Sequence, residues 1–248
     1  MVVWQDFQHF PQLQQDRVHV WRANLDSASS KRETLINILS ADEIERANRF
    51  RFDLDRARFI AARAILRKLL SSYLSVDPRS LQFSYGKQGK PLLLGSQNQP
   101  TLDFNISHSQ KYAIFGFGVE RAIGVDIEYQ KAMPDALKIA RRFFSDKESE
   151  ILVKSPSEQQ SKLFFQLWTA KEAYLKAIGT GLTGSLSKVE IALEQEQKLY
   201  FAEIADAASS NWCLHSYTPA CNYLGAIAFD THTPVAQIDF WHWQDREK

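Results

Sequence analysis

Apolar residues recur at helical spacing in two long stretches of the chain. The first stretch predicts an amphipathic helix over residues 56–74, and Asp77-Pro78 follows it as a stop signal. Its apolar positions are Phe59, Ile60, Ala64, Leu66, Leu69, Leu70 and Tyr73. Ser40 and Glu43, three residues apart, have the spacing of a capping box. This spacing predicts that another helix begins after Ser40 and precedes the helix over residues 56–74.

The second stretch predicts the longest helix, over residues 158–178, which Gly179 and Gly181 end. Its apolar stripe consists of Phe164, Phe165, Leu167, Trp168, Ala173, Tyr174 and Ile178. Two shorter helices are expected before it, one over Pro134–Phe144 and one beginning at a second capping box, Ser145 with Glu148.

Short apolar or alternating runs between these helices predict β-strands. The expected strands are Leu81–Tyr85, Leu102–Ser107, Tyr112–Val119, Ala122–Glu128, and residues 188–193, 198–204, 212–218, 223–229 and 235–240. The links between the late strands are too short for parallel crossovers, so we expect antiparallel sheets. The order is a long helix followed by strands, twice, which predicts an α+β protein with two halves, residues 1–120 and 121–248. A cleft is expected at the seam between them.

Composition narrows the class of protein. The 248 residues are 44% hydrophobic and 24% charged, as in ordinary globular proteins. No run reaches the about 20 apolar residues that a membrane span needs. The first residues, MVVWQDFQHF, lack a basic stretch before an apolar one, so we expect no signal peptide. We therefore expect a cytoplasmic protein in which Cys213 and Cys221 are free thiols.

The net charge of +1 hides an asymmetry between the halves. Residues 1–121 contain 17 Lys+Arg and 12 Asp+Glu, whereas residues 122–248 contain 13 and 17. Eight basic residues lie between Arg46 and Lys68, against two acidic ones. Such a patch suits an anionic ligand or an acidic partner, and a solvated helix face is the alternative.

Three carboxylates are candidates for a metal site. Asp126 and Glu128 lie two apart on a predicted strand, so their side chains share a face and repel unless a cation separates them. An exposed acidic strand face is the alternative. Glu172 lies on the longest helix between Lys171 and Lys176, where it is either a third ligand or a surface partner of Lys176.

Two further segments carry polar groups suited to a ligand. Phe104–Ser109 is an apolar strand that ends in Ser-His-Ser, but it lacks the G-x-S-x-G elbow of many serine hydrolases. Gly86–Pro91, GKQGKP, is a glycine turn with two lysines that lacks the P-loop spacing of nucleotide triphosphatases.

Five motifs in order resemble those of the Sfp-type 4′-phosphopantetheinyl transferases, over roughly residues 40–230. They are GKP at 89–91, FNISHS at 104–109, GVDIE at 124–128, RRFFS at 141–145 and LWTAKEAYLKAIGTGL at 167–182. The resemblance implies a monomer of two similar helix-plus-antiparallel-sheet halves related by a pseudo-twofold axis. It also implies transfer of 4′-phosphopantetheine from coenzyme A to a serine of an apo carrier protein, with release of adenosine 3′,5′-bisphosphate.

The resemblance assigns roles to individual residues. It implies Mg²⁺ as cofactor, with Asp126, Glu128 and Glu172 as ligands, and Glu172 as candidate general base for the serine hydroxyl. The implied coenzyme A contacts are Arg46, Arg58, Lys90, Ser107, His108, Lys171 and Lys176, with His108 at the 3′-phosphate. Glu43 stands where some members carry a lysine, so that phosphate contact is not expected here.

Two other readings remain open from the residues. A non-catalytic module that binds coenzyme A or carrier proteins could have the same fold, but it should have lost at least one of the three carboxylates. A nucleic-acid-binding protein could use residues 46–68, but the net charge of +1 and the core-like aromatic stripes speak against it. We expect no nucleic-acid or membrane partner. The carrier, from fatty acid, polyketide or peptide synthesis, is not specified by the sequence.

Overall fold

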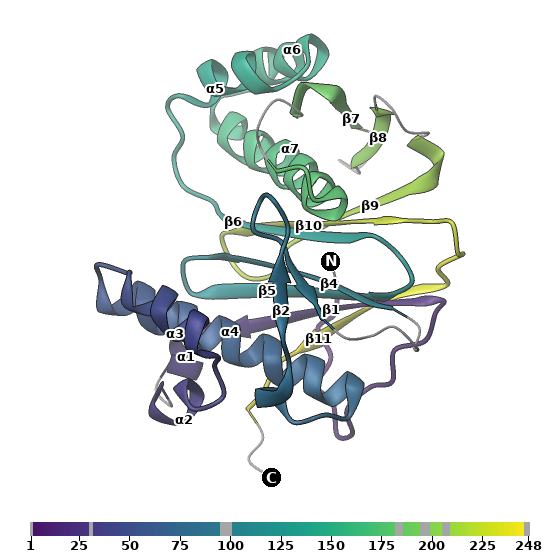
Figure 1. Ribbon diagram of the computed structural model, residues 1–248. Helices are drawn as coiled ribbons and strands as arrows, with labels where there is room; N and C mark the ends of the chain where they lie inside the picture. Colours follow the sequence, from purple (N-terminus) through teal and green to yellow (C-terminus); the bar gives the residue numbers. More distant parts are fainter. Residues whose placement is uncertain are drawn as a thin grey trace.

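Two β-sheets lie face to face at the centre of the computed structural model, and a long helix covers each outer face (Figure 1). The structure describes residues 2–29, 32–94, 101–181, 186–193, 199–204 and 209–245. One sheet has the order β11-β1-β5-β4, and the other has the order β6-β10-β9. Their strands are β1 Arg17–Asn24, β4 Leu102–Ser109, β5 Tyr112–Val119, β6 Ile123–Tyr129, β9 Trp212–Tyr217, β10 Tyr223–Asp230 and β11 Gln237–His242.

Alternating side chains along the strands build three cores. Val18, Val20 and Ile114 of the first sheet meet Val125 and Ile227 of the second in the central core. The opposite face of the first sheet packs on helix α4, Asp53–Leu74, and that of the second sheet packs on helix α7, Ser157–Ile178. The stack is therefore helix, sheet, sheet, helix.

The order of elements repeats along the chain, which confirms the predicted α+β fold of two similar halves. In each half a strand leads through short helices to a 22-residue helix, a two-stranded hairpin and two more strands. The first half has α1 Leu25–Ser29, α2 Arg32–Ile36, α3 Ala41–Asn48, β2 Phe83–Tyr85 and β3 Pro91–Leu93. The second has α5 Ala136–Phe143, α6 Asp146–Lys154, β7 Val189–Leu193 and β8 Leu199–Ile204. Their three-strand cores, β1-β5-β4 and β6-β10-β9, have the same connection order.

Strands β1 and β11 are the exception to the expected antiparallel pairing. They run parallel, with Val18 opposite Ile238 and Trp21 opposite Trp241. No element is predicted before residue 40, so the sequence pattern does not predict β1. The expected division near residue 120 falls in the turn between β5 and β6, and β11 then returns to the sheet of the first half.

Both predicted capping boxes are present, and each glutamate also binds a buried cation of the long helix. Glu43 at the start of α3 accepts hydrogen bonds from Arg63 Nε (2.6 Å) and Arg67 Nε (2.7 Å) of α4. Glu148 at the start of α6 lies 2.7 Å from the Lys171 ammonium of α7. The same device therefore anchors the long helix in each half, and Glu43 has a structural role rather than a phosphate contact.

Gly124 allows α7 to lie directly on β6. A Cβ at this position would be 2.0 Å from the Ala173 carbonyl oxygen and 2.3 Å from the Ala177 nitrogen, both in the α7 backbone. This close approach brings Glu172 and Lys176 over the strand that carries Asp126. No helix within the described ranges is both long and apolar enough to cross a bilayer.

Candidate active site

The candidate site lies where the edge strands of the two sheets meet, β4 from the first half and β6 from the second. Three side chains of β4 reach β6. Asn105 Oδ1 accepts from the Val125 N–H (3.0 Å), and the Ser107 hydroxyl donates to Asp126 Oδ1 (2.9 Å). The Ser109 hydroxyl donates to Glu128 Oε2 (3.0 Å). Asp126 and Glu128 thus lie at the seam, as the sequence analysis expects.

Helix α7 contributes Glu172 and Lys176 to the same place. Lys176 Nζ lies 2.6 Å from Asp126 Oδ1 and donates to the Ser107 hydroxyl at 2.8 Å. Glu172 is only 8% exposed, so it is not the surface partner of Lys176 that the alternative reading requires. Burial, followed by repulsion from Asp126, raises the pKa of Glu172 to about 7. Burial and the charge of Asp126 also raise the pKa of Glu128.

The donor set of these carboxylates fits a hard divalent cation. Asp126 Oδ2 and Glu172 Oε1 are buried without a hydrogen-bond partner, and the repulsion described above would be relieved by a positive charge. In the described part of the chain, however, no three His, Cys, Asp or Glu side chains lie close enough to form a metal cluster as they stand. Lys176 supplies the positive charge beside Asp126 in this structure.

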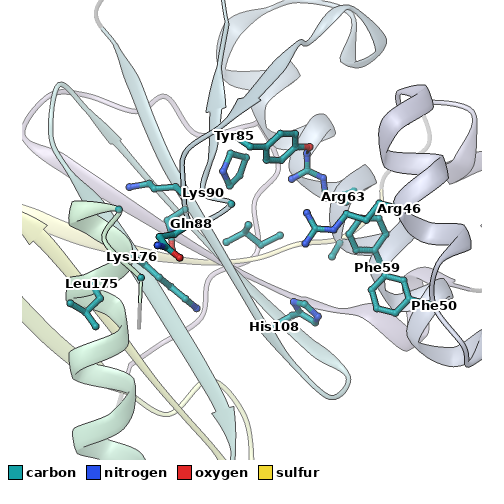
Figure 2. A pocket seen from close by; sticks show the side chains of 17 residues that line it. Arg46, Phe50, Phe59, Arg63, Tyr85, Gln88, Lys90, His108, Leu175 and Lys176 are labelled. Carbon is teal, nitrogen blue, oxygen red and sulfur yellow. Dashed lines mark hydrogen bonds between the residues drawn. The ribbon is translucent and has the colours of Figure 1, made fainter. Parts of the chain in front are cut away.

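A pocket of about 270 Å³, partly open to solvent, extends from the seam (Figure 2). Eight of its 17 lining residues are basic or aromatic. They are Arg46, Phe50, Phe59, Arg63, Tyr85, Lys90, His108 and Lys176. Figure 2 shows Arg46 and Arg63 on the side of the helices of the first half, and Lys176 on α7. Such a lining suits a ligand that has both anionic groups and an aromatic ring.

His108 and Arg46 are two of the predicted ligand residues that line this pocket. Desolvation in the pocket lowers the pKa of His108, and the positive charges of Lys176, Arg46 and Arg58 lower it further. The Arg46 guanidinium lies 5.5 Å from the centre of the Phe59 ring. A bound anion would reverse this effect on His108 and favour its charged form.

Lys90 and Arg58 lie at the site but already have protein partners. Lys90 Nζ donates to the carbonyl oxygens of Ile123 (3.2 Å) and Ala177 (2.9 Å), so the hairpin of the first half contacts the second half. Burial lowers the pKa of Lys90. Arg58 makes a two-point ion pair with Asp26 and lines an adjoining pocket with His108 and Ser109.

The expectation that Lys171 binds a phosphate is not supported by its position. Its side chain is fully buried in the second half, where it pairs with Glu148. It also donates to the carbonyl oxygens of Leu186 and Val189. Lys171 therefore connects α7 and α6 to the start of β7 rather than facing the seam. Leu182, the last residue of its motif, lies outside the described residues.

Sequence reasoning misses several lining residues. Arg63 belongs to the basic run 46–68, but its place in the pocket depends on the contact between α4 and the β2–β3 hairpin. Its guanidinium donates to the Tyr85 hydroxyl at 3.1 Å. Gln88 lies at the tip of that hairpin, and Asn105 is a buried residue of the FNISHS motif. Gln88 and Asn105 belong to the motifs GKQGKP and FNISHS, whereas Tyr85 belongs to no motif that indicates a ligand-binding role.

Comparisons with known proteins agree with this geometry. The 4′-phosphopantetheinyl transferase superfamily matches residues 122–228, and the family described as 4′-phosphopantetheinyl transferase, N-terminal, matches residues 23–116. The 4′-phosphopantetheinyl transferase HetI of Nostoc sp. is 41% identical over 93% of this chain and 94% of its own. The putative 4′-phosphopantetheinyl transferase slr0495 of Synechocystis sp. is 38% identical over 82% and 83%.

The chain belongs to the 4′-phosphopantetheinyl transferase superfamily. Within it, the chain is an enzyme with Sfp-like relatives, since the 4′-phosphopantetheinyl transferase Sfp of Bacillus subtilis is 31% identical over 73% of this chain and 78% of its own. The family resemblance of the five motifs is thereby confirmed.

Proposed function

We propose that this enzyme transfers 4′-phosphopantetheine from coenzyme A to a serine of an apo carrier protein, requires Mg²⁺, and releases adenosine 3′,5′-bisphosphate. One observation carries the proposal. The Asp126 carboxylate of β6 contacts the Ser107 hydroxyl of β4 and the Lys176 ammonium of α7, and Glu172 is close enough to Asp126 for the two carboxylates to repel. Lys176 also lines the pocket, together with Arg46, Lys90 and His108. Coenzyme A joins an adenine nucleotide with a 3′-phosphate to a pyrophosphate, which matches an aromatic and basic lining beside a carboxylate cluster.

In the proposed reaction the carrier serine is the nucleophile. Its Oγ forms a bond to the pyrophosphate phosphorus that bears pantetheine, and the bond from that phosphorus to the bridging oxygen breaks. Adenosine 3′,5′-bisphosphate leaves with the electron pair. Glu172 receives the serine proton, directly or through a water, since its buried Oε1 makes no hydrogen bond within the protein.

Asp126, Glu128 and Glu172 would hold Mg²⁺, which would neutralise charge on the pyrophosphate and on the departing bisphosphate. The residues of the pocket would bind and orient coenzyme A. Lys176 and Lys90 lie where they can exchange their protein partners for pyrophosphate oxygens. Arg46 and His108 lie farther along the pocket, where they would hold the 3′-phosphate.

Intact mass spectrometry tests the proposal. We expect apo carrier proteins from fatty acid, polyketide or peptide synthesis to gain the mass of phosphopantetheine in the presence of enzyme, coenzyme A and Mg²⁺. Excess chelator should prevent the gain, and a carrier whose acceptor serine is changed to alanine should not gain mass. Coenzyme A binding with no mass gain on any carrier would instead indicate a non-catalytic binding module.

Arg46→Ala and His108→Ala should weaken binding of coenzyme A far more than binding of 3′-dephospho-coenzyme A. A hydrogen bond to a charged group contributes about 1.5–3 kcal/mol, so the loss should be about ten- to a hundredfold for coenzyme A alone. Isothermal titration with both ligands measures this difference. Arg79→Ala is a matched control, because Arg79 pairs with Asp77 on the surface. Equal weakening for both ligands would place Arg46 and His108 at another part of coenzyme A.

We also propose that the enzyme acts as a cytoplasmic monomer. Both sides of the site come from one chain, which supports activity without a second copy. No disulfide joins Cys213 and Cys221, which fits a reducing compartment.

A further inference from the structure

The FNISHS strand contains a ladder of polar side chains that the proposed reaction does not use in full. Asn105, Ser107 and Ser109 are two residues apart on β4, so they share one face of the strand. Each makes a hydrogen bond to β6: Asn105 with the backbone N–H of Val125, Ser107 with the Asp126 carboxylate and Ser109 with the Glu128 carboxylate. We refer to these three contacts as the seam ladder.

The seam ladder joins two strands that belong to different sheets. Strand β4 is the last strand of the first sheet, and β6 is the last strand of the second. At this edge the side chains of β4 therefore fix where β6 lies along it. Because Asp126 and Glu128 belong to β6, the seam ladder also helps to set the position of their carboxylates along the seam.

Within the seam ladder, Ser109 makes the contact that restrains the Glu128 carboxylate. Its hydroxyl donates to Glu128 Oε2 (3.0 Å) and accepts from the Tyr129 N–H (3.0 Å), so it is oriented by the backbone of the same strand that carries the carboxylate. Ser109 borders the adjoining pocket together with Arg58 and His108, and it contacts the carboxylates of the proposed cation site through Glu128.

We infer that Ser109 is a positioning residue, which holds the Glu128 carboxylate in the orientation needed to bind the divalent cation. The inference rests on the proposed function, because that function places the cation at Asp126, Glu128 and Glu172. Groups that hydrogen-bond to a metal ligand orient it, and their loss costs about 10- to 100-fold in metal affinity or activity.

Titration of the enzyme with Mn²⁺, followed by the electron paramagnetic resonance signal of the free ion, tests the inference without substrate. Ser109→Ala should weaken Mn²⁺ binding by about tenfold or more. It should raise the Mg²⁺ concentration needed for half-maximal transfer while leaving the KM for the carrier protein unchanged. Ser109→Thr retains the hydroxyl and should restore Mn²⁺ affinity to near the wild-type value. Ser72→Ala removes an exposed helix hydroxyl far from the seam and should have no effect.

A double-mutant cycle with Glu128→Gln separates positioning from general stabilisation. If Ser109 acts through Glu128, Ser109→Ala should change Mn²⁺ affinity little once Glu128 is already Gln. Thermal melts should show all four proteins folded. Additive effects of the two substitutions, or wild-type affinity in Ser109→Ala, would overturn the inference and leave the proposed metal site standing. A wild-type enzyme that binds no Mn²⁺ would overturn the metal site and the role of Ser109 together.

Discussion

Glu172→Gln should lower the rate of phosphopantetheine transfer by at least about a hundredfold, because metal-ion stabilisation of transition-state charge is worth several kcal/mol. The amide retains the shape of the side chain but removes a charge that faces the proposed cation. It also cannot accept the serine proton. The Mg²⁺ requirement should move to higher concentration, and a turnover assay over a range of Mg²⁺ concentrations measures both effects.

The same substitution, Glu172→Gln, should raise the stability of the metal-free enzyme above neutral pH. The pKa of Glu172 is about 7 in the folded protein, against 4.5 for an unperturbed side chain. The folded state therefore binds more protons between these pH values, and the free energy of unfolding falls as pH rises from about 4.5 to 7. At pH 8 the metal-free Gln variant should exceed the wild type by up to about 3 kcal/mol. Below about pH 4 the difference should vanish.

Glu150→Gln is the matched control, since Glu150 pairs with Lys154 on the exposed face of α6. It should leave both transfer and the pH dependence of stability unchanged. A Glu172→Gln variant with normal turnover and a normal Mg²⁺ response would contradict both the ligand role and the base role.

Gly124→Ala should destabilise the fold by about 3 kcal/mol or more and reduce transfer by at least about a hundredfold. The added methyl group would overlap backbone atoms of Ala173 and Ala177, so α7 must move as a whole. The helix would carry Glu172 and Lys176 away from Asp126, and misplacement of catalytic groups by about 1 Å costs about that much in rate. Denaturant unfolding and a turnover assay measure the two losses.

Gly86→Ala provides the comparison for stability. A Cβ at Gly86 would approach the Lys90 carbonyl oxygen no closer than 3.7 Å, and the position has no left-handed backbone. It should cost less than about 1 kcal/mol. Unchanged stability in Gly124→Ala would mean that α7 does not rest on β6 in solution as it does here.

Local signals in the sequence were sufficient for most elements. The capping boxes at Ser40 and Ser145 gave the starts of α3 and α6, and the apolar stripes gave α4 and α7 to within a few residues. Strand β1 was missed although VHVW alternates, because its partners are β5 and β11, far along the chain. Its parallel pairing with β11 is a property of the whole topology.

Site residues that belong to a recognisable sequence motif could be predicted. Residues whose position depends on tertiary packing could be predicted less well. Asp126 and Glu128 could be placed on one strand face by period two alone. Lys171 could not be separated from Lys176 in the same way, because both are helix lysines and only the tertiary fold buries one against Glu148. The partner of Lys176 was also unpredictable, since Asp126 lies 50 residues away and on another element.

The pairing of β1 with β11 has a consequence for how the chain is made. Roughly 200 residues separate the two strands, so at 5–20 residues per second the ribosome needs about 10–40 s after making β1 before β11 is complete. During that time one edge of β1 presents unpaired backbone groups while the second half is still being synthesised. An open edge of this kind attracts other strands. The edge of β1 is therefore covered only after Asp126, Glu172 and Lys176 have been translated.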